Sequence, residues 1–154
     1  MENNLFPEDI DDELVDSEYE NEAEVIGYKL ASYFDFNSGD FVLNGKGQII
    51  TADGITGYKQ WCESVLATDR YNHESYTTDI GIDFNQVFAA SSREEAETIL
   101  ESEITEALEC DPYGRTQYVQ NVICEWIGPD TVEVTVDVVA LDNEIVTINK
   151  TLSK

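Results

Sequence analysis

Near the C-terminus, valine occupies every second position from Val132 to Val138, and the positions between carry Glu, Thr and Asp. Successive side chains of a β-strand point to opposite faces, so this alternation predicts a strand that is buried on one face only. One buried and one solvated face is typical of an antiparallel sheet. Turn-forming residues at 128–130 and 142–143 bound this strand and indicate a further strand on either side. The predicted strands are 118–127, 131–141 and 144–152.

Two amphipathic helices are predicted ahead of these strands. Residues 55–66 carry apolar side chains at helical spacing. A second helix begins at Ser92, which stands three residues before Glu95 in the spacing of a capping box, and an Asp-Pro pair at 111–112 ends it. Residues 72–88, between the helices, are expected to be irregular. The fold class is therefore predicted as α+β, with two main helices packed on an antiparallel sheet.

The N-terminal part has two sections of contrasting composition. Residues 1–27 hold 11 of the 33 acidic residues and no Lys or Arg, which predicts an acidic arm that stays disordered until a partner binds it. Apolar residues are interspersed among these acids: Leu5, Phe6, Ile10, Leu14, Val15 and Tyr19. Short β-prone segments then alternate with turns at 37–40 and 44–47, which predicts a β-meander. We expect an acidic arm over residues 1–27 and a single domain over residues 28–154.

The charge balance excludes two classes of partner. The chain has 8 Lys and Arg against 33 Asp and Glu, a net charge of −25, so it repels nucleic-acid phosphates and anionic lipids. Neither a run of 18 apolar residues nor a signal peptide is recognisable in the sequence. The three cysteines have no C-x-x-C spacing, which indicates reduced thiols in a cytoplasmic protein.

The sequence offers no recognisable catalytic or cofactor site. His73 is the only histidine, and it lies in a polar run that indicates an exposed loop. No cluster has the spacing of metal ligands, and no glycine-rich phosphate loop is present. With 33 carboxylates, a pair of acids suited to glycoside hydrolysis has no diagnostic weight. We therefore predict a protein that is not an enzyme and needs no cofactor.

Arg70 is a scarce cation that directly follows the first predicted helix and stands beside Tyr71. A guanidinium presents a planar fork of donors and stacks on aromatic rings, so it suits a fixed protein interface or a buried ion pair. Tyr76 and Gly81 complete the segment, and we predict that all four residues bind a neighbouring protein. An intramolecular salt bridge of Arg70 remains the alternative.

Two segments carry a resemblance to a known family. The first is GYKQWCESVLATDRY at 57–71, followed by Tyr76 and Gly81, and the second is ITEALECDP at 104–112, followed by the valine-rich strands. Together they resemble the XkdS-like branch of the phage baseplate-wedge family, the sheath initiators of contractile tails. The resemblance extends over about residues 33–152.

This resemblance implies a structural component of the baseplate wedge in a contractile phage tail or phage-tail-like particle, made in the bacterial cytoplasm. The strand-rich end would receive the first ring of the tail sheath protein by strand addition, and other wedge proteins would contact the segment around Arg70. Tail tube or hub proteins are further candidate partners. In one respect the sequence departs from the family, which continues its Asp-Pro pair with Arg, whereas here the next arginine is Arg115.

The last predicted strand leaves an edge with free backbone donors and acceptors, which is a template for strand addition by another chain. Ile145, Thr147 and Asn149 mark this candidate edge. The alternative is an edge blunted by Lys150 and Lys154. A second functional hypothesis, of another class, is a small acidic chaperone that holds a basic client protein.

Overall fold

The computed structural model describes residues 27–52, 54–72 and 77–154. The predicted acidic arm lies outside the described residues except for Gly27, and so do His73 and Tyr76. The elements in chain order are β1 (Ala31–Ser32), β2 (Phe34–Asp35), β3 (Asp40–Phe41), β4 (Thr51–Ala52), α1 (Gly54–Ala67), α2 (Phe84–Phe88), α3 (Arg93–Glu109), β5 (Thr116–Trp126), β6 (Thr131–Ala140), a 3₁₀ turn (Leu141–Asn143) and β7 (Ile145–Ser153).

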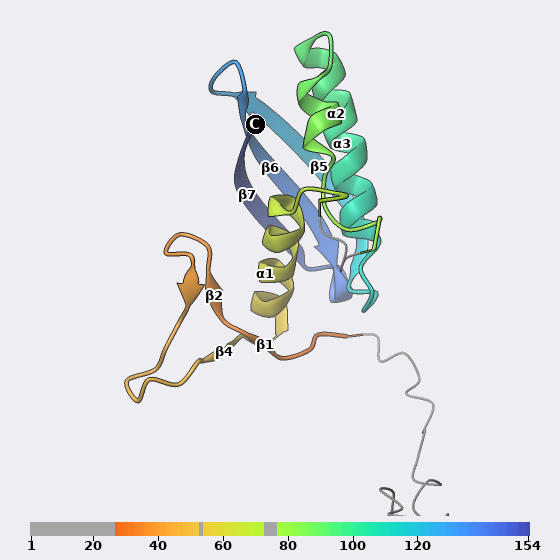
Figure 1. Cartoon of the computed structure of the whole chain (residues 1–154). Helices are drawn as coiled ribbons and strands as arrows, with labels where there is room; N and C mark the ends of the chain where they lie inside the picture. Colours follow the sequence, from red (N-terminus) through yellow and green to blue (C-terminus); the bar gives the residue numbers. More distant parts are fainter. Residues whose placement is uncertain (1–26, 53, 73–76) are drawn as a thin grey trace, which may run out of the picture.

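The body of the molecule has two layers (Figure 1). An antiparallel sheet of order β5-β6-β7 forms one layer, and the helices cover one of its faces, with α1 packed against β7 and α3 against β5. This arrangement confirms the predicted α+β class. No helix in the described part of the chain combines the length and apolar character needed to cross a bilayer.

The central strand β6 explains why the sheet has one covered face. Val132, Val134, Val136 and Val138 are all fully buried beneath the helices. The residues between them lie on the opposite face, where polar side chains form hydrogen bonds between β6 and β7. The alternation of valine with polar residues thus corresponds to an antiparallel strand that is buried on one face only.

The two long helices follow from local sequence signals. In α1 the apolar stripe buries Tyr58, Cys62 and Leu66, and the helix is one residue longer at each end than predicted. The Oγ of Ser92 accepts a hydrogen bond from the Glu95 N–H at the start of α3, which confirms the predicted N-cap.

Part of the segment predicted to be irregular is helical. Helix α2 spans Phe84–Phe88 and packs on α3, and the Asp83 carboxylate caps it by accepting from the Gln86 N–H. Five residues make little more than one turn, which is too short for an apolar periodicity to be visible in the sequence.

Residues 31–52, which we call the β-arm, extend from the lower end of the body (Figure 1). Strand β1 pairs with β4 and β2 pairs with β3, both antiparallel, and a bridge joins Leu43 to Ile49. These short strands correspond to the predicted meander. The segment that holds β1 and β2 pairs both with β3 and with β4, whereas in a simple meander it would pair only with the strand that follows it.

Candidate protein-interaction site

Arg70 is buried, with 4% of its surface exposed, and its ion pairs lie within the chain. Its Nη1 is 3.4 Å from both Glu103 Oε2 and Glu106 Oε2 on α3. Its Nε donates to the Gly81 carbonyl at 3.0 Å. The intramolecular salt bridge that the sequence left open is therefore present, and a contact of Arg70 with a neighbouring subunit stays a prediction.

The network around Arg70 fixes the turn that follows α1. Burial opposes the charge of the guanidinium, but Glu103 and Glu106 together hold the pKa of Arg70 above its usual value. Glu103 also accepts from the Asp83 N–H, so one carboxylate joins Arg70 to the start of α2. Among the described residues, Nη2 of Arg70 has no hydrogen-bond acceptor.

Gly81 is required by the same turn for steric reasons. Its φ is +94°, and a Cβ at this position would lie 2.6 Å from the Thr68 carbonyl oxygen. The close approach allows Ile82 to exchange backbone hydrogen bonds with Thr68 and Arg70. Gly81 therefore has a conformational role in this turn, and as a glycine it has no side chain that could contact a partner.

Tyr71 is the exposed member of this group. Its side chain is 66% exposed, and its φ of 71° is unfavourable for a bulky residue. Backbone strain of this kind persists only where the surroundings impose it, and the hydrogen bonds of Arg70 supply that restraint. Of the four residues predicted around Arg70, the structure brings Arg70, Tyr71 and Gly81 together, and Tyr76 lies outside the described residues.

A second buried arginine forms a clamp that the sequence reasoning missed. Arg115 donates through Nη2 and Nε to the two oxygens of Asp111, at 2.7 and 2.9 Å, and its guanidinium lies about 5 Å from the ring centroids of Tyr58, Trp61 and Tyr113. This clamp fixes the turn from α3 into β5. Its signal in the sequence was the spacing of Asp111 and Arg115, four residues apart across a Pro and a Gly.

Hydrogen bonds at both ends of the β6–β7 pair determine which backbone groups of β7 face outward. The Ala140 N–H donates to the Glu144 carbonyl at 2.8 Å, and the Lys154 N–H donates to the Asp130 carbonyl at 3.2 Å. Alternate residues of an antiparallel strand face the same partner, so the even-numbered residues of β7 bond to β6. The odd-numbered residues direct N–H and C=O away from the sheet, and we call these groups the open edge. They belong to Ile145, Thr147, Asn149, Thr151 and Ser153.

The opposite edge of the sheet, on β5, is interrupted. Register shifts between Thr116 and Tyr118 and between Val119 and Asn121 break its ladder. The Glu109 carboxylate also accepts from the Val119 N–H at 3.3 Å. Bulges and side-chain caps of this kind are how proteins protect a strand edge from pairing.

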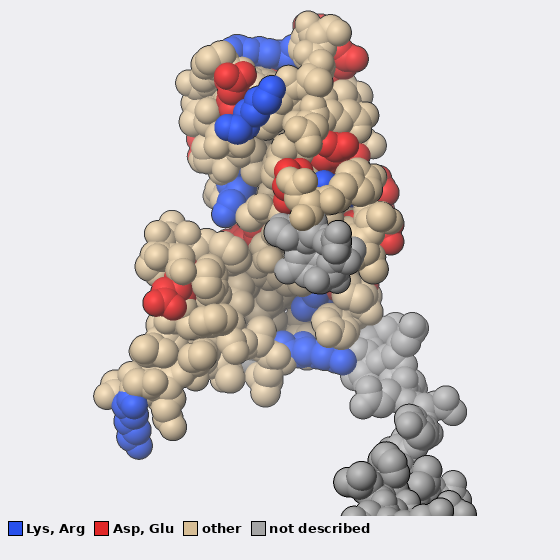
Figure 2. Space-filling view, viewed as in Figure 1, with Lys and Arg blue, Asp and Glu red and all other residues tan. Residues whose placement is uncertain are grey.

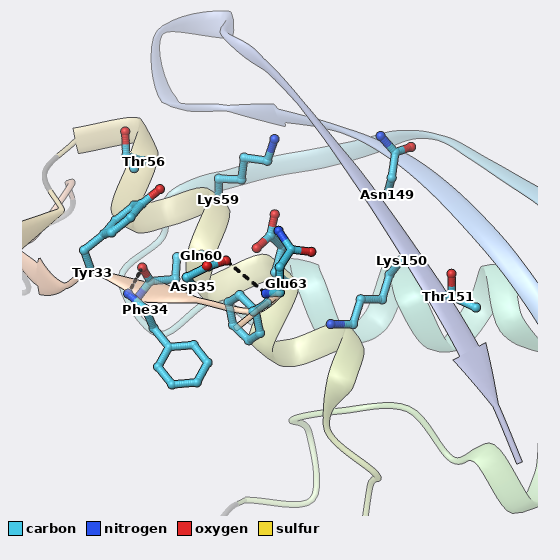
Figure 3. A pocket seen from close by; sticks show the side chains of 12 residues that line it. Tyr33, Phe34, Asp35, Thr56, Lys59, Gln60, Glu63, Asn149, Lys150 and Thr151 are labelled. Carbon is cyan, nitrogen blue, oxygen red and sulfur yellow. Dashed lines mark hydrogen bonds between the residues drawn. The ribbon is translucent and has the colours of Figure 1, made fainter. Parts of the chain in front are cut away.

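A groove of about 600 Å³ runs beside the open edge, between the β-arm, α1 and residues 149–151 of β7 (Figure 3). Lys150 extends into it, and its Nζ lies 4.9 Å from the centroid of the Phe36 ring. Lys150 is therefore held toward the β-arm, while Lys154 follows the end of β7. Within the described ranges, no group of three or more His, Cys, Asp or Glu could hold a metal ion.

A regular strand edge next to a groove is typical of surfaces that bind other polypeptide chains. The family model of the contractile injection system sheath initiator matches residues 32–143, which is more than half of the chain. The chain therefore belongs to the sheath-initiator family, a structural component of contractile injection systems. The match ends before β7, and the search of curated proteins found no match.

Proposed function

We propose that this protein joins the baseplate wedge of a contractile phage tail or tail-like particle to the first ring of its sheath. The open edge of β7 would accept a strand from the sheath protein, and Tyr71 would contact a neighbouring wedge protein. Membership of the sheath-initiator family supports the general role. The XkdS-like branch, the wedge partners and the baseplate location are parts of the proposal.

The proposal rests on the alternation along β7 between residues that form hydrogen bonds to β6 and residues whose backbone groups face away from the sheet. Five residues have outward backbone groups without a partner among the described residues, along a strand whose pairing with β6 is regular over nine residue pairs. Because the β5 edge is interrupted, an added strand has one regular template in the sheet. Side chains at Ile145, Thr147 and Asn149 are exposed on the uncovered face, where they are available to a fourth strand.

Arg70 has a positioning role in this proposal. It is buried against α3 and restrains the backbone of Tyr71, so the aromatic ring is presented at a fixed place on the surface. A rigid exposed tyrosine supplies contact area at low entropic cost. Residues 28–154 would act as one structural domain, and residues 1–27 as an acidic arm attached to it.

Thr147→Pro tests the strand addition, because proline removes an outward N–H and fits best on edge strands. Thr147→Val is the matched control, since both variants lose the hydrogen bond from the threonine hydroxyl to Asp137 but valine keeps the N–H. Electron microscopy of assembled particles should show baseplates and tubes without sheath for Thr147→Pro, and complete tails for Thr147→Val. Normal sheaths on Thr147→Pro particles would contradict the proposal.

Tyr71→Gly tests the anchor separately. Glycine relieves the left-handed conformation, so the free protein should gain about 1 kcal/mol in free energy of unfolding. Incorporation into baseplates should nevertheless fall, because the aromatic ring is lost. Tyr71→Asn, which tolerates the same φ, should also assemble poorly. If both variants are incorporated like the parent protein, Tyr71 is not an anchor.

The acidic chaperone remains a second candidate only through the net charge. A chaperone would form a stoichiometric complex with one basic client, whereas a wedge component would co-purify with several baseplate proteins. Size-exclusion chromatography with light scattering on the natively purified protein distinguishes these outcomes.

A further inference from the structure

A second groove, which shares Phe34, Phe36 and Gln60 with the one beside β7, lies where the β-arm meets α1 and the turn after α3. Its volume is about 640 Å³, and aromatic rings dominate its walls, with Phe34, Phe41, Trp61 and Tyr113 among them. We call it the aromatic groove. Phe41 and Leu30 at its margin are exposed, so the structure leaves apolar surface uncovered there.

The charges around the aromatic groove are opposite to those of the rest of the protein. Although the chain has 33 acids, none of the residues that line the groove is acidic. Two of the lining residues, Lys29 and Arg115, are basic. Arg115 is already neutralised by Asp111. Lys29 lies 4.4 Å above the ring of Tyr113 and makes no ion pair with any other described residue, so it supplies the free positive charge.

Helix α3 shows the contrast most clearly. Its exposed surface carries glutamates along its whole length, with a single arginine at its start. In Figure 2 acidic atoms gather over the helical part of the molecule, whereas the surface of the β-arm below is mainly uncharged. A peptide that combines carboxylates with apolar side chains would be repelled by α3 and attracted to the aromatic groove.

The chain itself contains such a peptide. Residues 5–15 read LFPEDIDDELV, with five carboxylates among five aliphatic or aromatic side chains. This segment joins the groove through residues 16–28, and Lys29 and Leu30 at the end of that connection already line the groove. A connection of this length reaches more than 30 Å, and tethering of this kind gives an effective concentration on the order of millimolar.

We propose that residues 5–15 occupy the aromatic groove of the same molecule before assembly, with a carboxylate on Lys29 and apolar side chains over Phe41 and Trp61. The acidic arm is then an internal cover for an apolar surface. This role is independent of strand addition at β7.

Carbodiimide cross-linking of the full-length protein tests the proposal, because it joins carboxylates to lysines without a spacer. The measured quantity is the yield of peptides that link the acids of residues 8–13 to Lys29, in an equal mixture of ¹⁴N- and ¹⁵N-labelled protein. We expect links within one isotope, which identify an intramolecular contact. Links that mix the two isotopes in statistical proportion would overturn the proposal in favour of a second copy.

A pair of variants separates groove binding from the effect of the tether alone. Phe41→Ser removes an aromatic wall and should lower the yield of links to Lys29 roughly fivefold or more. Leu43→Ser is the matched control, because Leu43 is also exposed on the β-arm but does not line the groove, and its yield should be unchanged. Equal yields for the parent protein and both variants would overturn the proposal. Circular dichroism of both variants would check that the fold is kept.

Discussion

The two edges of the sheet are built in opposite ways. On the β5 side, bulges, the Glu109 carboxylate and the Arg115–Asp111 clamp satisfy or distort the backbone. On the β7 side the pairing is regular to the end, and the outer backbone groups have no hydrogen-bond partner in the part of the chain that the structure describes. We call these the closed side and the open side. An unprotected edge is an aggregation hazard, and under the proposed strand addition the open side is the edge that a sheath strand would cover.

The largest expected effect concerns the clamp of the closed side. Arg115→Ala leaves Asp111, whose side chain is 1% exposed, without its partner, and should lower the free energy of unfolding by about 3–5 kcal/mol. Urea denaturation measures this loss. Arg115→Lys keeps the charge but not the planar fork, so it should recover only part of the stability. An unchanged unfolding midpoint for Arg115→Ala would show that the closed side does not depend on the clamp.

Alkaline pH should loosen the contact between α1 and the closed side, where the Tyr58 hydroxyl lies 2.7 Å from the Thr116 Oγ1 of β5. Burial raises the pKa of the Cys62 thiol from 9.0 to about 12, and burial also raises the pKa of Tyr58. Both groups hold their protons more tightly in the folded protein than in the unfolded chain. Their contribution to the free energy of unfolding is therefore complete below about pH 9 and is lost as the pH rises.

The free energy of unfolding should then fall by up to about 1.4 kcal/mol per pH unit for each group. Denaturation series from pH 8 to 11 measure the slope. Cys62→Ala should reduce the slope that begins near pH 9, and an identical slope in that variant would rule out the thiol as its source.

Self-association compares the two sides directly. Free edges of two copies can pair, so the parent protein should dimerise weakly at high concentration, and more strongly in high salt, which screens the net charge of −25. Thr147→Pro should weaken the dimer roughly tenfold, whereas Thr147→Val should not. Sedimentation measures the dissociation constants. A dimer that survives Thr147→Pro unchanged would have to use another surface.

The smallest effect is expected from Glu109→Ala. The substitution frees the Val119 N–H on the closed side, but the neighbouring bulges remain. Stability should change by less than about 1 kcal/mol and dimerisation should stay the same, as judged by denaturation and sedimentation. A marked increase in association would mean that the carboxylate, not the bulges, protects β5.

The sequence predicted those features that depend on local periodicity. The alternation around Val134 identified β6, the stripe through Tyr58 identified α1, and the Ser92 cap began α3. The features it could not predict depend on contacts between distant segments. Nothing local indicates that Arg70 meets Glu103 and Glu106 of α3, because this contact follows from the packing of the helices.

The open edge has one further property. Its donors and acceptors are main-chain groups, which are the same whatever amino acid stands at the position. Apart from proline, no single replacement deletes them, so the exposed residues of β7 can vary within the limits of the strand. An edge of this kind tolerates sequence drift, so under the proposed strand addition a chain can diverge widely from its relatives and still present the same backbone groups.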